Sequence, residues 1–199
     1  MDSPFMSLFA KLMEERSVET IRFEFKYMAA RREGGKKRPP PKAETLIPEF
    51  EAILDEVGHS ALPLVIGGKS MGGRVASMVA DALFAQGRIC GLLCLGYPFH
   101  PPGRPEQLRT AHLADLRTPA LIVQGTRDEF GTREEVASYR LSPQIAMLWL
   151  EDGDHDLKPR KRVSGFSAAD HLGTMAATAF AWAERCCLRA AHLPRGRGP

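Results

Sequence analysis

The stretch Pro63–Ala76, PLVIGGKSMGGRVA, places a glycine-rich turn between an apolar run and a helical pattern. Gly68–Ser70 matches the end of a phosphate-binding loop, whereas Gly68–Gly72 matches the G-x-S-x-G nucleophile elbow. A phosphate loop needs a glycine five residues before its Gly-Lys-Ser end. That position holds Pro63, and residues 64–66 belong to the apolar run, so no loop is left to surround a phosphate. The nucleophile elbow is therefore the better interpretation.

The elbow interpretation makes Ser70 a candidate nucleophile. A nucleophile on a sharp strand-to-helix turn needs small neighbours, and Gly68 and Gly72 stand two residues to either side of Ser70, with Gly73 next. The helix that follows would point its first N–H groups at an oxyanion formed there. A glycine-rich turn needed only for close packing is the alternative.

Apolar runs alternate with amphipathic helical patterns along the rest of the chain. Strands that are apolar throughout are typical of a parallel sheet with helices on both faces, which makes the fold class α/β. We expect one domain over residues 1–193 and a loose basic tail at 194–199. The expected strands are 21–25, 64–66, 89–95, 120–123 and 145–150. Helices are expected to begin near Ser3, Leu46, Met71 and Ser167, and residues 29–42 are expected to be irregular.

Composition narrows the class of protein. The 199 residues carry a net charge of +3, from 27 basic and 24 acidic side chains, which is too small an excess to predict nucleic-acid binding by the whole domain. We expect no membrane span and no secretory signal. None of the four cysteines has metal-ligand spacing with histidines, so we expect reduced thiols, a cytoplasmic protein, and no metal or organic cofactor.

A serine nucleophile requires a base and an orienting acid, and in this fold class the chain order is serine, acid, histidine. Asp128 follows the 120–123 strand, and His155 follows the 145–150 strand. Both strand ends should meet at the edge of the sheet where Ser70 lies. A solvated loop histidine is the alternative for His155.

Other side chains compete for the same roles. His100 and His112 precede Asp128, so their order in the chain is wrong for the base. Glu129, Asp154 and Asp156 are rival acids. A direct sequence neighbour of His155 is badly placed to accept from its Nδ1 atom, so Asp128 is preferred.

These motifs, taken in order, resemble the α/β-hydrolase superfamily, and more narrowly a small bacterial group related to dienelactone hydrolases. The resemblance covers nearly the whole chain. It implies that Ser70 is the nucleophile, Asp128 the acid, His155 the base and the Met71 N–H one oxyanion donor. The stretches that carry it are Met28–Arg32, Gly68–Ser77, Leu95–Pro102, Gln124–Asp128 and Glu151–Pro159.

One departure from the resembled pattern is at the N-terminus. The family pattern implies a strand before the first helix, ending in a loop that supplies the second oxyanion donor, whereas Met1 here stands almost at the helix start. We therefore expect an N-terminally truncated chain. The alternative is that the 21–25 strand pairs directly with the 64–66 strand.

Basic residues gather beside the predicted site. The loops 31–38 and 158–162 are rich in Lys and Arg, and Lys69 lies in the elbow itself. They predict a positive rim that attracts an anionic substrate, and solvated loop charges are an equal alternative. Phe99 and His100 leave a strand at the same edge, and we expect them to line the substrate pocket.

The predicted function is that of a serine hydrolase acting on small ester-type molecules, which include small anionic esters, through Ser70, Asp128 and His155. A non-catalytic interaction module on a hydrolase fold is the alternative. The sequence carries no prediction of the oligomeric state.

Overall fold

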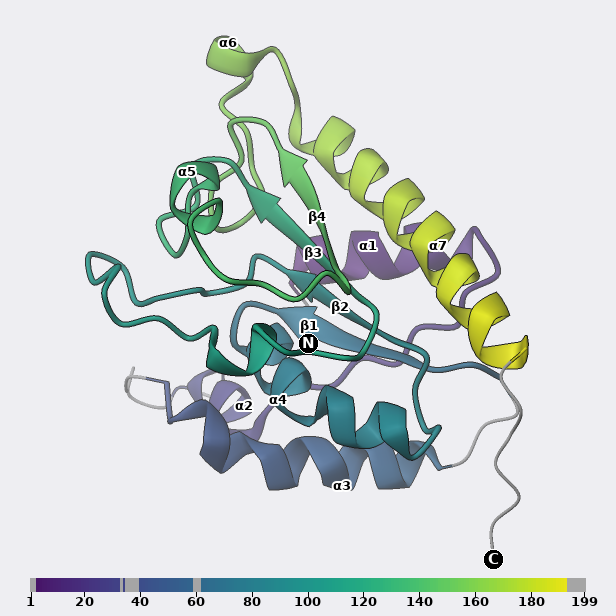
Figure 1. Cartoon of the computed structure of the whole chain (residues 1–199). Helices are drawn as coiled ribbons and strands as arrows, with labels where there is room; N and C mark the ends of the chain where they lie inside the picture. The colour runs from purple at the N-terminus through teal and green to yellow at the C-terminus, as the bar shows by residue number, and fades with distance from the viewer. Residues whose placement is uncertain (1–2, 33, 35–39, 59–61, 193–199) are drawn as a thin grey trace, which may run out of the picture. The chain divides into compact units, whose positions relative to one another are not determined.

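The computed structural model describes residues 3–32, 34, 40–58 and 62–192, apart from the side chains of 189–192. It divides into two compact units, Met1–Ser60 and Ala61–Pro199 (Figure 1). The single domain over residues 1–193 stays a prediction. The tail predicted at 194–199 lies outside the described residues.

The first unit contains helices whose starts follow the sequence signals. The helix α1 (Pro4–Glu14) begins where predicted, because the Ser3 hydroxyl accepts a hydrogen bond from the Met6 N–H and proline occupies the first turn. The 3-10 turn η1 (Ala43–Leu46) leads into α3 (Ile47–Val57). Each helix has an apolar stripe with buried members, which are Phe9 and Met13 in α1 and Phe50 and Leu54 in α3.

Two predictions for this unit are wrong. Residues 21–25 form no strand, although their side chains alternate in polarity. A strand needs a ladder partner, whereas here Phe23 packs edge-on against the rings of Phe25 and Phe50, at centroid distances of 5.3 and 5.5 Å. The helix α2 (Lys26–Arg32) occupies the start of the segment expected to be irregular. Its basic C-terminal residues suit the negative end of the helix dipole, and Arg32 also lies 3.2 Å from Glu24.

The second unit is built on a parallel sheet, as predicted. Its strands are β1 (Val65–Lys69), β2 (Gly91–Leu95), β3 (Ala120–Gly125) and β4 (Ile145–Leu150), in the order β1-β2-β3-β4. All three pairings are parallel. Among the described residues no further strand joins this sheet, so β1 is an edge strand and the alternative pairing with residues 21–25 is absent.

Two helices cover opposite faces of the sheet (Figure 1). Side chains alternate between the faces along β2. A Cβ atom at Gly91 would lie 2.7 Å from the Trp182 ring of α7 (Ala168–His192), whereas one at Gly73, in α4 (Met71–Ala85), would lie 3.2 Å from the Cβ of Cys94. Gly91 and Cys94 stand three residues apart, so they face opposite sides.

The shorter elements and the cap of α7 complete this unit. The helix α7 begins near Ser167 as predicted, because the Ser167 hydroxyl accepts from the Asp170 N–H and the Asp170 carboxylate accepts from the Ser167 N–H, which together form a capping box. The short helices are η2 (Ala111–Leu113), α5 (Arg133–Val136) and α6 (Lys161–Ser164). No helix of the described chain has both the length and the apolar character needed to cross a membrane.

Candidate active site

Ser70 stands on a strained turn between β1 and α4. Its φ of 51° and ψ of −116° are unusual for a residue other than glycine, and its N–H donates to the Leu95 carbonyl across 2.9 Å. The turn is tight because a Cβ at Gly68 would lie 2.7 Å from the backbone of Gly72. A Cβ at Gly73 would lie 2.7 Å from the Gly68 carbonyl oxygen, whereas one at Gly72 would meet nothing within 4 Å. The glycines that the turn requires are therefore Gly68, the first glycine of the motif, and Gly73, which follows the motif.

His155 reaches Ser70 from the loop that follows β4. Its Nε2 lies 2.8 Å from the Ser70 Oγ. Gly96, at the end of β2, allows this approach, because a Cβ there would lie 2.9 Å from the His155 carbonyl oxygen. Gly96 also has a φ of +65°, which favours glycine. The Phe130 ring lies against the imidazole, with 4.1 Å between ring centroids, and limits its rotation.

Asp128 accepts from the other side of the imidazole. Its Oδ2 and Oδ1 atoms lie 2.9 and 3.1 Å from the His155 Nδ1. The side chain is fully buried, and Oδ1 also accepts from the Phe130 N–H at 2.9 Å. An ionised carboxylate can only accept, so Nδ1 carries the proton and Nε2 is left to accept from the Ser70 hydroxyl. The structure thus joins the three side chains in the order hydroxyl, imidazole, carboxylate.

The loops that carry Asp128 and His155 are in direct backbone contact. A Cβ at Gly125 would lie 2.2 Å from the Gly153 carbonyl oxygen, so only glycine fits there. The Arg127 N–H donates to the same oxygen across 3.1 Å, and the Thr126 hydroxyl accepts from the Asp152 N–H at 2.8 Å. Parallel strands end at one edge of the sheet, and this contact fixes the two loops relative to each other.

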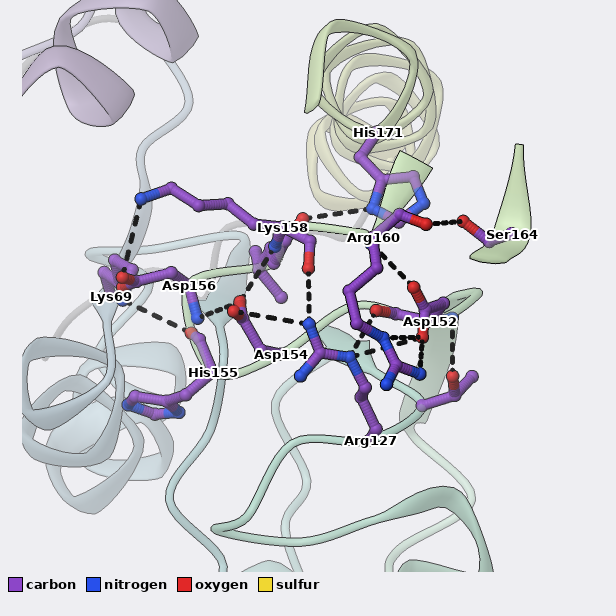
Figure 2. A network of polar contacts seen from close by, with 12 residues as sticks. Lys69, Arg127, Asp152, Asp154, His155, Asp156, Lys158, Arg160, Ser164 and His171 are labelled. Carbon is purple, nitrogen blue, oxygen red and sulfur yellow. Dashed lines mark hydrogen bonds and ion pairs between the residues drawn. The ribbon is translucent and has the colours of Figure 1, made fainter. Parts of the chain in front are cut away.

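A network of ion pairs shapes the His155 loop (Figure 2). The buried Asp152 carboxylate accepts from the Arg160 backbone at 2.6 Å and from its guanidinium Nε at 2.9 Å. The Arg127 guanidinium donates to the Asp152 carbonyl at 2.8 Å and to the Lys158 carbonyl at 3.2 Å. The Arg160 hydrogen bond is the main cause that lowers the pKa of Asp152 to about 2. Arg160 is thus engaged in holding the loop.

Lys69 connects the nucleophile strand to the same loop (Figure 2). Its Nζ donates to the Asp156 Oδ1 at 2.8 Å and to the His155 carbonyl at 3.3 Å. The hydrogen bond from Lys69 lowers the pKa of Asp156. Asp154 instead accepts from the backbone N–H groups of Asp156 and Lys158, at 2.9 and 3.0 Å. Asp154 and Asp156, two of the three rival acids, thus take part in the fold of the loop, and the carboxylate that contacts the His155 Nδ1 is that of Asp128.

The remaining predicted site residues have other surroundings. Phe99 is fully buried, with its ring near those of Tyr97 and Tyr139 at 4.9 and 5.8 Å. His100 is also buried, with Nδ1 2.8 Å from the Pro101 carbonyl and Nε2 3.4 Å from the Glu135 carboxylate. Their part in binding substrate stays a prediction.

Met71 opens α4 directly after the nucleophile. The first N–H groups of a helix have no acceptor within it, which is the condition that the predicted oxyanion role of the Met71 N–H requires. That role stays a prediction. No group of three histidine, cysteine or acidic residues suited to a metal ion occurs in the described part of the chain.

Sequence reasoning missed the residues that support the three side chains. Gln124 is a polar side chain within the otherwise apolar strand β3, and that irregularity was the available signal. Gly96, Gly125 and Gly153 each end or follow a strand, yet a glycine at such a position is also common in ordinary turns. Their necessity depends on backbone atoms that are distant in the sequence.

Comparisons with known proteins identify the family and the fold of the chain. The model of a family described as an alpha/beta hydrolase domain matches residues 1–184. The solved structures that share the fold include three from different source organisms. An alpha-beta serine hydrolase homologue from Coxiella burnetii is 19% identical with a TM-score of 0.65, over 91% of this chain and 76% of that one. The esterase domain of a Rhodothermus marinus protein is 15% identical, with a TM-score of 0.64 over 91% and 80%. Est1E of Butyrivibrio proteoclasticus, with ferulic acid bound, is 14% identical, with a TM-score of 0.60 over 90% and 84%.

Proposed function

Because the chain belongs to the alpha/beta hydrolase domain family and is a hydrolase of that fold, we propose that it cleaves ester-type substrates through an acyl-enzyme on Ser70. One observation carries the proposal: the Ser70 hydroxyl lies 2.8 Å from an imidazole whose other nitrogen lies 2.9 Å from a buried carboxylate. The narrower likeness to dienelactone hydrolases belongs to the same proposal.

In the first half of the reaction, the Ser70 Oγ attacks the ester carbonyl while His155 Nε2 takes its proton. The imidazolium that forms is stabilised by Asp128, whose carboxylate accepts from Nδ1. The carbonyl oxygen becomes an oxyanion, and the N–H of Met71 at the positive end of α4 stabilises it. His155 then gives its proton to the alcohol oxygen, and the alcohol leaves.

In the second half, water replaces the alcohol. His155 Nε2 takes a proton from a water molecule, the water oxygen attacks the acyl carbonyl, and the Ser70 oxygen leaves with the proton from the imidazolium. The strained backbone at Ser70 and the Phe130 ring against His155 hold both groups in the attacking geometry throughout. Every proton is returned, so this chemistry needs only the substrate and water.

A fluorophosphonate probe tests the proposal, because it phosphonylates an activated serine. We expect labelling of the wild-type protein and none of Ser70→Ala. Ser77→Ala is a matched control, because the Ser77 hydroxyl lies 2.8 Å from the His112 Nε2 yet is buried within α4. It should label like wild type. A wild-type protein that hydrolyses no ester and takes no label would instead favour the non-catalytic interaction module.

A narrower proposal concerns the charge of the substrate. Lys69 and Arg160 are paired with Asp156 and Asp152, so a preference for anionic esters depends on the remaining basic residues of the two loops. Lys36 and Lys37, which lie outside the described residues, are the direct test. Reversing their charge should raise KM for anionic esters and leave neutral esters unchanged; equal changes for both would contradict the preference. A cytoplasmic location for this activity also remains part of the proposal.

A further inference from the structure

Gln124 has a polar side chain in the buried core of the sheet, where an unsatisfied polar group destabilises the folded state. It occupies the second-last position of β3, is fully buried, and follows four apolar residues of the strand. A buried carboxamide destabilises a fold unless its hydrogen-bonding groups are satisfied. Its partners therefore show why an amide stands at this position.

The carboxamide is held in one orientation by its partners. Its Oε1 accepts from the Tyr97 N–H at 2.7 Å, and its Nε2 lies 3.1 Å from the Tyr97 carbonyl and 3.3 Å from the Gly131 carbonyl. The third group near Nε2 is the Asp128 carboxylate, at 2.9 Å. Turning the amide over would direct its oxygen at three acceptors and its NH₂ at a donor, so the assignment of the two atoms follows from the network.

The contact with Asp128 falls on the oxygen nearest to the base. Oδ2 accepts from the Gln124 Nε2 at 2.9 Å and lies 2.9 Å from the His155 Nδ1, while Oδ1 is held by the Phe130 N–H. Each carboxylate oxygen thus has a donor of its own in addition to the imidazole. Without Gln124, the Phe130 N–H would be the one donor besides the imidazole left on the Asp128 side chain among the described contacts.

We propose that Gln124 is a positioning residue, which orients the Asp128 carboxylate towards His155 and thereby sets the strength of the base. This inference rests on the proposed function. Gln124 touches neither the nucleophile nor the proposed oxyanion donor in the described contacts, so it acts through Asp128. It also joins the turn after β2 to the acid loop through Tyr97, and a purely structural role would consist of that connection alone.

Two substitutions separate these roles. Gln124→Glu keeps an oxygen to accept from the Tyr97 N–H, and it places a second carboxyl group beside Asp128. Gln124→Met has a similar length and removes every hydrogen bond of the amide. We expect both variants to lower kcat about 10- to 100-fold with KM nearly unchanged, because the base acts in the transition state and not in substrate binding.

The pH profile of Gln124→Met gives a readout that a structural role would not move. Without the amide donor, the Asp128 carboxylate is held less firmly against Nδ1 and stabilises the imidazolium less, so the acidic limb of kcat/KM should shift downward. The NMR resonance of the His155 Nδ1 proton should move with it, which reports on the bond to Asp128 independently of turnover. An unmoved limb and an unmoved resonance in this variant would overturn the proposal.

A double-mutant cycle with Asp128→Asn completes the experiment. If Gln124 acts through Asp128, the kcat of the double variant Gln124→Met, Asp128→Asn should lie within about twofold of the kcat of Asp128→Asn alone. The same 10- to 100-fold loss in both backgrounds would mean a structural role and would overturn the proposal. Wild type and Ser70→Ala are assayed alongside. If wild-type hydrolysis does not depend on Ser70, the proposed function is wrong. If hydrolysis depends on Ser70 but the effects of the Gln124 and Asp128 substitutions on kcat are independent of each other, only the proposed role of Gln124 is wrong.

Discussion

Two adjacent glycines of α4 provide a sharp test of the elbow geometry. Gly72 and Gly73 receive the same substitution, to alanine, in the first turn of the same helix. Alanine should gain up to about 1 kcal/mol of helix propensity at either position. Their surroundings differ, because a Cβ at Gly72 meets nothing within 4 Å and one at Gly73 lies 2.7 Å from the Gly68 carbonyl oxygen.

The size of the effect follows from that distance. Ordinary van der Waals contact begins at 3.4 Å, so Gly73→Ala must open the turn by the difference between 2.7 and 3.4 Å. The Cys94 side chain, at 3.2 Å, blocks the opposite direction. Overpacking of this kind costs about 1–3 kcal/mol, which for a chain of this size corresponds to a Tm about 2–12 °C below that of Gly72→Ala. Because Gly68 stands two residues before Ser70, hydrolysis should also fall about 10- to 100-fold.

Thermal unfolding and hydrolysis of a small chromogenic acetate ester measure the two effects. We expect Gly72→Ala to unfold at or above the wild-type temperature, although Gly72 is the second glycine of the motif. Gly73→Ala should lose both stability and activity. Equal loss in the two variants, or a stable and fully active Gly73→Ala, would refute the steric account of the turn.

Three further predictions concern other parts of the second unit. Gly96→Ala should lower kcat at least tenfold, because the new Cβ would lie 2.9 Å from the His155 carbonyl oxygen and φ is +65°; a variant with wild-type kcat would contradict this. Because the pKa of Asp152 is lower in the folded protein, its carboxylate stabilises the fold above pH 3.8, and this stabilisation is lost as the pH falls towards about 2. Asp152→Asn should therefore lower the Tm at pH 7. In thermal melts, the Tm of this variant should also depend less on pH between 4 and 2 than the Tm of wild type does. Cys90 and Cys187 are free cysteines whose Sγ atoms lie 2.9 Å apart. Oxidation by dilute hydrogen peroxide should therefore form a disulfide between them, which mass spectrometry would detect, and the disulfide should raise the Tm. In Cys187→Ser, neither the disulfide nor the rise in Tm should occur.

The sheet could be predicted from the sequence because its signals are local. The runs at β2, β3 and β4 are apolar at nearly every position, which is typical of a parallel sheet covered on both faces. A different pattern, the alternation of polar and apolar side chains, wrongly indicated a strand at residues 21–25. Whether such a segment pairs depends on a partner elsewhere in the chain, and periodicity says nothing about partners.

The candidate site was predicted in part for a similar reason. The elbow motif selected Ser70, and chain order with strand ends selected Asp128 and His155. The structure brings the three side chains within hydrogen-bonding distance. The basic run after His155 was interpreted as a rim for substrate, yet Arg160 binds Asp152 within the loop. The sequence gives the sign and position of each charged residue. Which residue a charged side chain pairs with depends on the path of the loop, which the sequence alone does not give.

The loop that carries His155 is held by hydrogen bonds among its own residues and from Arg127, and these contacts involve neither Ser70 nor a bound ester. The loop should therefore keep the imidazole in place before any substrate arrives. By the same reasoning, replacement of the Ser70 hydroxyl should leave the backbone of residues 151–160 where it is.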